Sequence, residues 1–202
     1  MRIEIMVFDG FDELDVFGPL EVLSAAAGRG APLSVGLVGA HRSGSVHAQH
    51  GTHVVVDAVL GTPDAVVVPG GGWLNRAPAG AWAEVQAGTL PGRLAAIAPD
   101  LSWVASVCSG AMLLSAAGLL QGRHATTNAS VKGELAAAGA QVLDHRVVDD
   151  GEVITAGGLS AGLDLGLHLV EREAGAELAR QLEASLEYRA WHDTWRRQTE
   201  KG

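Results

Sequence analysis

The only cysteine of the sequence, Cys108, lies where one residue pattern gives way to another. The apolar segment 102–107 before it is rich in β-branched and aromatic residues and predicts a buried strand. After Gly110, small and apolar residues predict a helix over 111–117. A nucleophile at such a turn can meet substrate, and the free N–H groups of a helix N-terminus favour an anion. We therefore expect Cys108 to be a partly exposed thiolate of lowered pKa, the alternative being an inert core cysteine.

Two other features could share a site with Cys108. Asp15 follows an expected strand at 2–8, and the run Gly70–Gly72 follows a β-branched strand at 64–68. Glycines let backbone N–H groups approach an anion, although the Lys-Ser/Thr of a phosphate-binding loop is absent from this run. Ligand sites form beyond the carboxyl ends of parallel strands, so all three features are expected to converge. The alternatives are that Asp15 only caps a helix and that the glycines form a plain turn.

Three histidines, His47, His50 and His53, raise the question of a metal site. On an extended chain, spacings of three put His50 on the face opposite its neighbours, and Gly51 suggests a turn between two short strands. Asp57 is the only acid close by in the sequence. We expect exposed loop histidines and no metal site.

The remaining segments predict an α/β domain with a mainly parallel sheet. Pro19 would clash with the carbonyl of Asp15, so we expect a turn holding Asp15, a break at Gly18-Pro19 and then a helix to about Ala27. Further strands are expected at 33–38, 122–128, 141–148 and 152–156, with a hairpin turn at 149–151, and helices at 79–98 (interrupted near Pro91), 130–138, 160–173 and 175–189. In the tail, Trp191 and Trp195 are spaced to form an apolar helix face.

Composition limits the class of protein. The 202 residues, 48% of them hydrophobic, fit one domain over 1–202 with a substantial core. The longest uncharged stretch, 101–120, is interrupted by serines and glycine, so we expect a buried strand and helix rather than a membrane span. A lone cysteine cannot form an internal disulfide, which fits a cytoplasmic location. The net charge of −9 argues against a nucleic-acid surface, which needs clustered Lys and Arg.

Three motifs together resemble one family. They are VFDGFDELDVFGPLEVL at 7–23, VVVPGGG at 66–72 and SVCSGAMLLSAAGLLQGRHATTN at 106–128. In this order they resemble the ThiJ/PfpI superfamily over nearly the whole chain. The resemblance implies a three-layer α/β sandwich of the class I glutamine amidotransferase-like (flavodoxin-like) type.

Within that superfamily, the sequence is most similar to isocyanide hydratases and to the amidase-like domain of AraC-type regulators. The shared features are the LDxxGPxEV pattern at 14–22 and a small hydroxyl residue, Ser109, after the cysteine. The resemblance implies that Cys108 is the nucleophile and Asp15 its acid partner. The regulators bind DNA through a basic helix-turn-helix domain that these residues do not provide, so no nucleic-acid partner is expected.

The resemblance also assigns the groups around the nucleophile. The oxyanion donors fall on the backbone of Gly71 or Gly72 and of Ser109. The protease-like branch has histidine where Ser109 stands, which argues against a peptidase. Asn128 occupies the place where many members have a histidine after the Thr-Thr pair, so it is a candidate substrate-binding residue.

The resulting prediction is cysteine-dependent addition of water to a small electrophile, best an isocyanide giving an N-substituted formamide. One alternative is glyoxalase- or deglycase-like chemistry on 2-oxoaldehydes with the same thiolate. The other is a small-molecule or redox sensor that keeps the cysteine without turnover. We expect no cofactor, no membrane partner and a homodimer, with an apolar face around Val16, Phe17 and Leu20 near the site.

Overall fold

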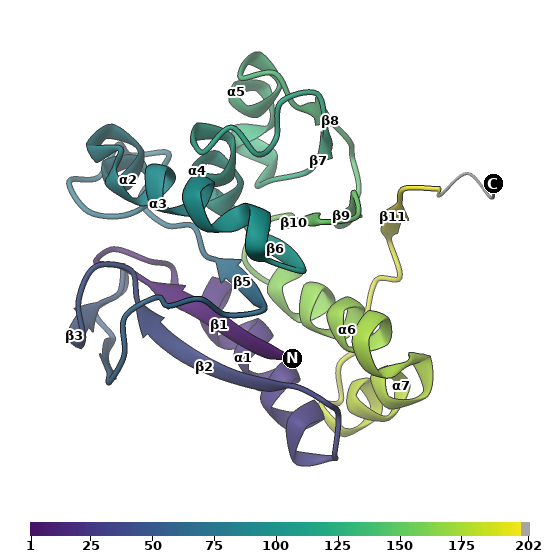
Figure 1. Cartoon of the computed structure of the whole chain (residues 1–202). Coiled ribbons are helices and arrows are strands. Elements are labelled where there is room, and N and C mark those ends of the chain that lie inside the picture. Colours follow the sequence, from purple (N-terminus) through teal and green to yellow (C-terminus); the bar gives the residue numbers. More distant parts are fainter. Residues whose placement is uncertain (199–202) are drawn as a thin grey trace.

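A computed structural model describes residues 1–198 of the chain and shows a sheet with helices on both faces (Figure 1). The strand order is β11-β9-β10-β6-β5-β1-β2. The strands are β1 (Arg2–Val7), β2 (Ser34–Gly39), β5 (Ala65–Val68), β6 (Trp103–Val107), β9 (Val147–Asp149), β10 (Val153–Ala156) and β11 (Thr194–Arg196). Five strands run parallel from β10 to β2, whereas β9 is antiparallel to β10. This is the predicted three-layer, mainly parallel α/β sandwich.

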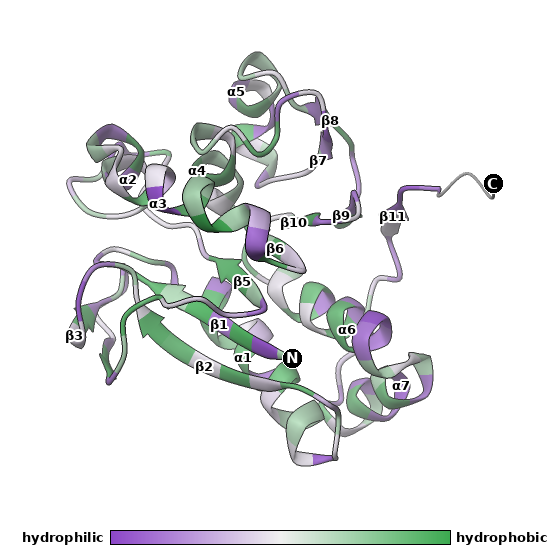
Figure 2. Ribbon diagram, viewed as in Figure 1, coloured by the Kyte–Doolittle hydropathy of each residue, from purple (hydrophilic) through white to green (hydrophobic). Residues whose placement is uncertain are grey.

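Each helical layer gathers segments that are distant in the sequence (Figure 1). One face of the sheet carries α1 (Glu13–Gly28), α6 (Ala161–Ala174) and α7 (Ala176–Ser185), and the other carries α2 (Ala81–Ala87), α3 (Thr89–Ile97), α4 (Gly110–Ala116) and α5 (Lys132–Ala137). The short elements are β3 (Gly44–His47), β4 (His53–Val56), β7 (His124–Ala125), β8 (Gln141–Val142) and the 3-10 turns η1 (Ala98–Asp100) and η2 (Ala129–Val131). The strands β5 and β6 are buried throughout, as expected for strands covered on both faces. All residues of β5 are apolar (Figure 2).

The expected break at Gly18-Pro19 is wrong, because α1 runs through Pro19 without interruption. The proline lacks the N–H that would bond to the carbonyl of Asp15, which costs about 3 kcal/mol in a helix interior. Packing offsets that cost. A Cβ added to Gly162 would lie 3.0 Å from Pro19 Cδ. Gly18 is buried against the backbone of Gly162, so α1 and α6 approach closely here.

Three other expectations need correction. The helical stretch at 79–98 is broken at Gly88, which adopts φ 73°, while Pro91 lies in the first turn of α3 where a proline is tolerated. Of the strand expected at 122–128, only β7 forms, paired with β8. The segment with Trp191 and Trp195 is not helical, because α7 ends at Ser185 and the chain then adds β11 alongside β9.

The apolar face expected on α1 is also only partly correct. Val16 is fully buried in the core, and Leu20 is partly buried. Phe17 is 36% exposed and Leu14, one turn away, 41% exposed. The solvent-facing apolar pair of α1 is therefore Leu14 and Phe17. Among the described residues no helix combines the length and the apolar character needed to cross a bilayer.

Candidate active site

Cys108 occupies a strained turn between β6 and α4, as the sequence predicts. Its φ of 55° is rare for a residue with a side chain. Gly110 makes the turn possible, because a Cβ there would lie 2.3 Å from the carbonyl oxygen of Val68. Cys108 N–H donates to the Gly157 carbonyl (2.8 Å), and Thr127 Oγ1 donates to the Cys108 carbonyl (2.7 Å). These bonds hold the backbone in a conformation that costs on the order of 1–3 kcal/mol.

Asp15 lies in the first turn of α1 and is completely buried. Its Oδ2 accepts a hydrogen bond from Gly70 N–H at 2.9 Å. Its Oδ1 has no hydrogen-bond partner among the described residues; the Cys108 thiol is close enough to affect the pKa of Asp15 without meeting hydrogen-bond geometry. Asp12, not Asp15, caps α1 by accepting from Leu14 N–H at 3.1 Å. The capping alternative for Asp15 is thus wrong.

Burial and mutual repulsion raise the pKa values of both acidic groups of this pair, the Asp15 carboxyl group and the Cys108 thiol. Burial, followed by the charge of Asp12, raises the pKa of Asp15 well above its usual range, and the Gly70 N–H and the thiol offset this only in part. Burial, followed by the charge of Asp15, raises the pKa of Cys108 to about 12. The pair therefore shares one proton between its two titrations.

The expected low pKa of Cys108 is consequently wrong for the protein without ligand. Three donors do favour the thiolate, namely the backbone N–H groups of Ser109 and Leu159 and the side chain of Asn128. However, the residue is only 8% exposed, so loss of hydration outweighs these donors and the helix end.

The glycine run joins three polar side chains of the site. Besides the bond from Gly70 to Asp15, Gly71 N–H donates to Ser109 Oγ (3.1 Å) and Gly72 N–H donates to Gln49 Oε1 (2.6 Å). A Cβ at Gly70 would lie 2.5 Å from Ser109 Oγ, so the close approach requires glycine. The N–H groups of Gly71 and Gly72 are occupied, which corrects the expectation that they are free oxyanion donors.

A pocket of about 230 Å³ opens beside Cys108. Its lining includes five of the expected residues, Gly71, Gly72, Cys108, Ser109 and Asn128, but not Asp15. Sequence reasoning missed the other seven lining residues: Asp12, Gln49, Trp73, Leu74, Asn75, Val131 and Leu159. Only Leu159 had a signal, because it follows a Gly-Gly pair at the end of β10, as the glycine run follows β5.

The three histidines do not converge on a common point. His47 and His53 stack across the β3–β4 hairpin with ring centroids 4.2 Å apart, and His50 lies in the connecting turn. His50 instead approaches Asp12 and Glu13 at the edge of the pocket, with ligand-type atoms within 4.8 Å of one another. Glu13 accepts from His50 N–H at 3.0 Å, so hydrogen bonding explains why these groups gather.

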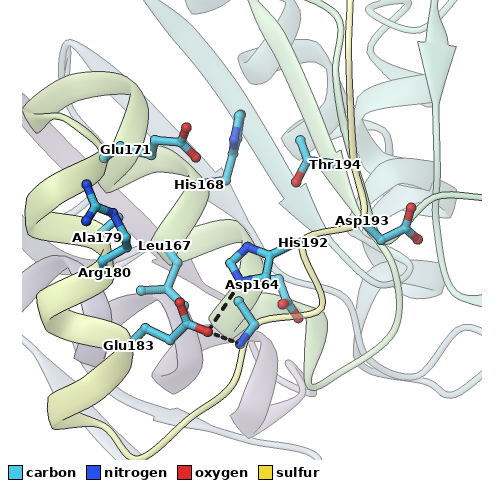
Figure 3. A pocket seen from close by; sticks show the side chains of 12 residues that line it. Asp164, Leu167, His168, Glu171, Ala179, Arg180, Glu183, His192, Asp193 and Thr194 are labelled. Carbon is cyan, nitrogen blue, oxygen red and sulfur yellow. Dashed lines mark hydrogen bonds and ion pairs between the residues drawn. The ribbon is translucent and has the colours of Figure 1, made fainter.

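A second cavity, of about 250 Å³, lies between α6, α7 and the segment that leads to β11 (Figure 3). Its charged side chains are partnered. Asp164 meets Arg146 (2.5 Å) and Tyr188 (2.8 Å), and Glu183 accepts from Ala190 N–H (2.7 Å). In the same lining, His168, Glu171, Arg180 and Asp193 pair respectively with Asp149, Arg196, Glu177 and His145.

Comparison with known proteins gives a consistent result. Residues 1–172 match the model of the DJ-1/PfpI family. An isonitrile hydratase from Pseudomonas putida is 32% identical over 189 residues, which cover 93% of this chain and 78% of that protein. A deglycase from Thermococcus kodakarensis is 29% identical over 160 residues, 77% of this chain and 89% of that protein. Among solved structures, a ThiJ/PfpI family protein from Pseudomonas syringae superposes with a TM-score of 0.77 at 28% identity, over 93% of this chain and 74% of that one.

Proposed function

The chain belongs to the DJ-1/PfpI family, and we propose that it is a cysteine-dependent hydratase that converts a small isocyanide into an N-substituted formamide. The observation that carries the proposal is the buried pair of Cys108 and Asp15, in which Asp15 Oδ1 has no hydrogen-bond partner among the described residues. Similarity to an isonitrile hydratase supports this choice of reaction. The aspartate at position 15 also supports it, because the deglycase-like branch has glutamate at that position.

In the first step, Cys108 Sγ attacks the terminal carbon of the isocyanide while its proton passes to Asp15. Asp15 then delivers this proton to the same carbon, and a thioimidate R–N=CH–S–Cys108 forms. The isocyanide has inserted into the S–H bond, so no proton is gained or lost. The step needs one proton on the pair, which is the state of the pair between its two titrations.

In the second step, water adds to the thioimidate carbon. Asp15, now a carboxylate, takes one proton from the water and passes it to the nitrogen as the carbon becomes tetrahedral. Collapse forms the C=O bond, breaks the C–S bond and returns a proton to the pair. The donors beside the sulfur, Ser109 N–H, Leu159 N–H and Asn128, stabilise the departing thiolate. Gly72 N–H can reach the new oxygen only when Gln49 releases it.

A parallel assay tests this proposal against its alternatives. Cyclohexyl isocyanide and methylglyoxal are offered separately to the wild-type protein and to Cys108→Ala, and formamide or lactate is quantified. We expect Cys108-dependent formamide and no lactate. Lactate alone would replace the hydratase by glyoxalase-like chemistry. No turnover of either compound, combined with rapid sulfinate formation at Cys108, would identify a redox sensor.

We also propose that the protein is a homodimer that uses the exposed pair Leu14 and Phe17 of α1. Both side chains lie within one turn of Asp15, so the interface would adjoin the site. Light scattering at micromolar concentration measures the mass directly. A dimeric wild type and a monomeric Phe17→Glu variant are expected, and a monomeric wild type would contradict the proposal.

A further inference from the structure

The apolar side chains that line the Cys108 pocket are Trp73, Leu74, Val131 and Leu159, here called the apolar wall. Trp73 is its largest member and is only 5% exposed. It lies at the start of the segment 73–80, which has neither helix nor strand between Gly72 and α2. The position of Trp73 is therefore not fixed by regular secondary structure, and something else must hold it.

Glu134, on α5, holds this tryptophan. A buried indole N–H needs a partner, and Trp73 Nε1 donates to Glu134 Oε2 at 3.1 Å. Arg76 donates to the same carboxylate oxygen, also at 3.1 Å. The Arg76 guanidinium lies 3.9 Å from the Trp82 ring centroid, and Trp82 packs edge-on against Trp73 at 5.2 Å. One carboxylate thus fixes both the tryptophan and the loop behind it.

The same stretch of chain that carries Glu134 also reaches the sulfur. Asn128 caps η2, Val131 ends it, and Glu134 lies in the first turn of α5. The Val131 N–H donates to the Asn128 carbonyl at 2.8 Å, so these residues belong to one short, hydrogen-bonded segment. From this segment Asn128 acts on the Cys108 thiol, Val131 joins the wall, and Glu134 grips Trp73. One short segment therefore contacts both the apolar wall and the reactive sulfur and fixes their relative position.

We propose that Glu134 is a positioning residue that sets the apolar wall and so selects reactants with a compact hydrocarbon substituent, such as a cyclohexyl or benzyl group. A volume of about 230 Å³ is below the usual range of drug-sized pockets, roughly 300–1,000 Å³. The lining includes the acid Asp12 and, in the part of the chain that the structure describes, no Lys or Arg. An anionic substituent is therefore disfavoured. For isocyanides the inference rests on the proposed hydratase function, but it applies to any electrophile that reaches Cys108.

Alkylation of Cys108 tests the wall without requiring turnover. Because the sequence has one cysteine, intact mass reports the reaction of iodoacetamide and of N-benzyliodoacetamide without ambiguity. Both reagents lose iodide, so the ratio of their rates cancels changes in the thiol itself. We expect wild type to favour the benzyl reagent and Glu134→Ala to lose that preference by about tenfold, the effect of one lost hydrogen bond of about 1.4 kcal/mol.

Two further variants separate the hydrogen bond from the charge and from general damage to α5. Glu134→Gln keeps an oxygen acceptor for Trp73 and should retain most of the preference. Asp144→Ala removes an exposed ion pair with Lys132 of α5. Neither Asp144 nor Lys132 lines the pocket, so this variant should retain the full preference for the benzyl reagent. Equal ratios in wild type and Glu134→Ala, or an equal loss in Asp144→Ala, would overturn the inference.

Hydration kinetics then distinguish this inference from the proposed function. With cyclohexyl isocyanide, Glu134→Ala should raise KM by about tenfold with kcat nearly constant, since a positioning residue acts on binding. A change in the alkylation ratio without any isocyanide turnover would refute the hydratase and leave the wall in place. If Glu134→Ala hydrates the isocyanide with an unchanged KM and an unchanged alkylation ratio, the hydratase function stands and the inference about Glu134 is refuted.

Discussion

The two cavities of similar size differ in how their charged groups are compensated. Beside Cys108, two acids lie buried together, and Asp15 Oδ1 has no partner among the described residues. In the cavity between α6 and α7, Asp164 accepts hydrogen bonds from Arg146, from Tyr188 and from Trp191 N–H. An uncompensated buried acid costs stability, whereas a compensated one costs little or contributes.

This difference in hydrogen bonding indicates which of the two cavities is suited to catalysis. The cavity near Asp164 is slightly the larger, at about 250 Å³ against about 230 Å³, so size does not distinguish them. At the Cys108 pocket the backbone is strained, Cys108 and Asp15 have raised pKa values, and Asp15 Oδ1 has no partner among the described residues. Strain and unmet polar groups of this kind collect at functional sites, where their cost is tolerated. The following variants test that contrast.

The largest effect is expected from replacing the nucleophile. Cys108→Ala should lower isocyanide hydration by at least about 10³-fold, because no other group can form the thioimidate. The matched control is Glu183→Gln in the second cavity, which keeps an acceptor for Ala190 N–H and should leave the rate within about twofold. Formamide production measures both. Comparable losses in the two variants would remove the functional distinction between the cavities.

The next effect comes from Asp15→Asn, which keeps the shape of the side chain but cannot cycle a proton. Turnover should fall by about 10²–10⁴-fold.

The free energy of unfolding of Asp15→Asn should instead be higher than that of wild type. Because the folded pKa of Asp15 is raised, the wild type loses stability as pH rises from the ordinary carboxyl pKa to the folded one, and the variant does not.

Denaturant unfolding at pH 7 checks this sign. The free energy of unfolding should be higher for Asp15→Asn than for wild type, with the gap closing below about pH 4, the ordinary carboxyl range. A rate within about threefold of wild type would retire the proton-transfer role. A less stable variant would instead mean that the carboxylate is a structural group like those of the second cavity.

A smaller effect concerns the pH dependence of Cys108 alkylation. Burial and the Asp15 charge raise the thiol pKa to about 12, so the rate with iodoacetamide should keep rising between about pH 7 and 10 without a plateau at the ordinary thiol pKa of about 8.5. In Asp15→Asn the charge is gone, and the same curve should shift to lower pH. A wild-type plateau below about pH 8.5 would show that the helix end and the three donors outweigh burial.

Much of this architecture could be predicted from the sequence, because strand ends in a parallel sheet share one edge. That rule predicts that Asp15, the glycine run and Cys108 lie close together. The errors have a common source in long-range packing. Pro19 remains helical because Gly162, far along the chain, lets α1 and α6 approach. The tail forms β11 rather than a helix because β9 offers it a free edge.

The electrostatics of the site were less predictable than its position. The pKa of Cys108 depends on burial and on hydrogen bonds from residues as distant in the sequence as Asn128 and Leu159, whereas the local sequence indicates only the helix end. The link from Trp73 to Glu134 spans 61 residues and has no periodic signature. The N–H groups of Gly71 and Gly72 were expected to be free because their acceptors, Ser109 and Gln49, could not be assigned from spacing.

The smallest expected effect is His168→Gln, in the second cavity. Burial alone would raise the pKa of Asp149, but the neighbouring His168 at 2.7 Å, the Gly151 N–H and the charge of Arg172 lower it below its ordinary value. Wild type therefore has a contribution to stability that is present above about pH 4 and is lost as pH falls through the folded pKa of Asp149. Removing the histidine should cost about 1 kcal/mol in the free energy of unfolding at pH 7 and make its decline in acid shallower. Isocyanide hydration should stay within about twofold of wild type, because His168 is distant from the pocket that Cys108 lines. A variant with intact stability and lost turnover would show that the compensated cavity also takes part in catalysis, and the contrast between the two cavities would then fail.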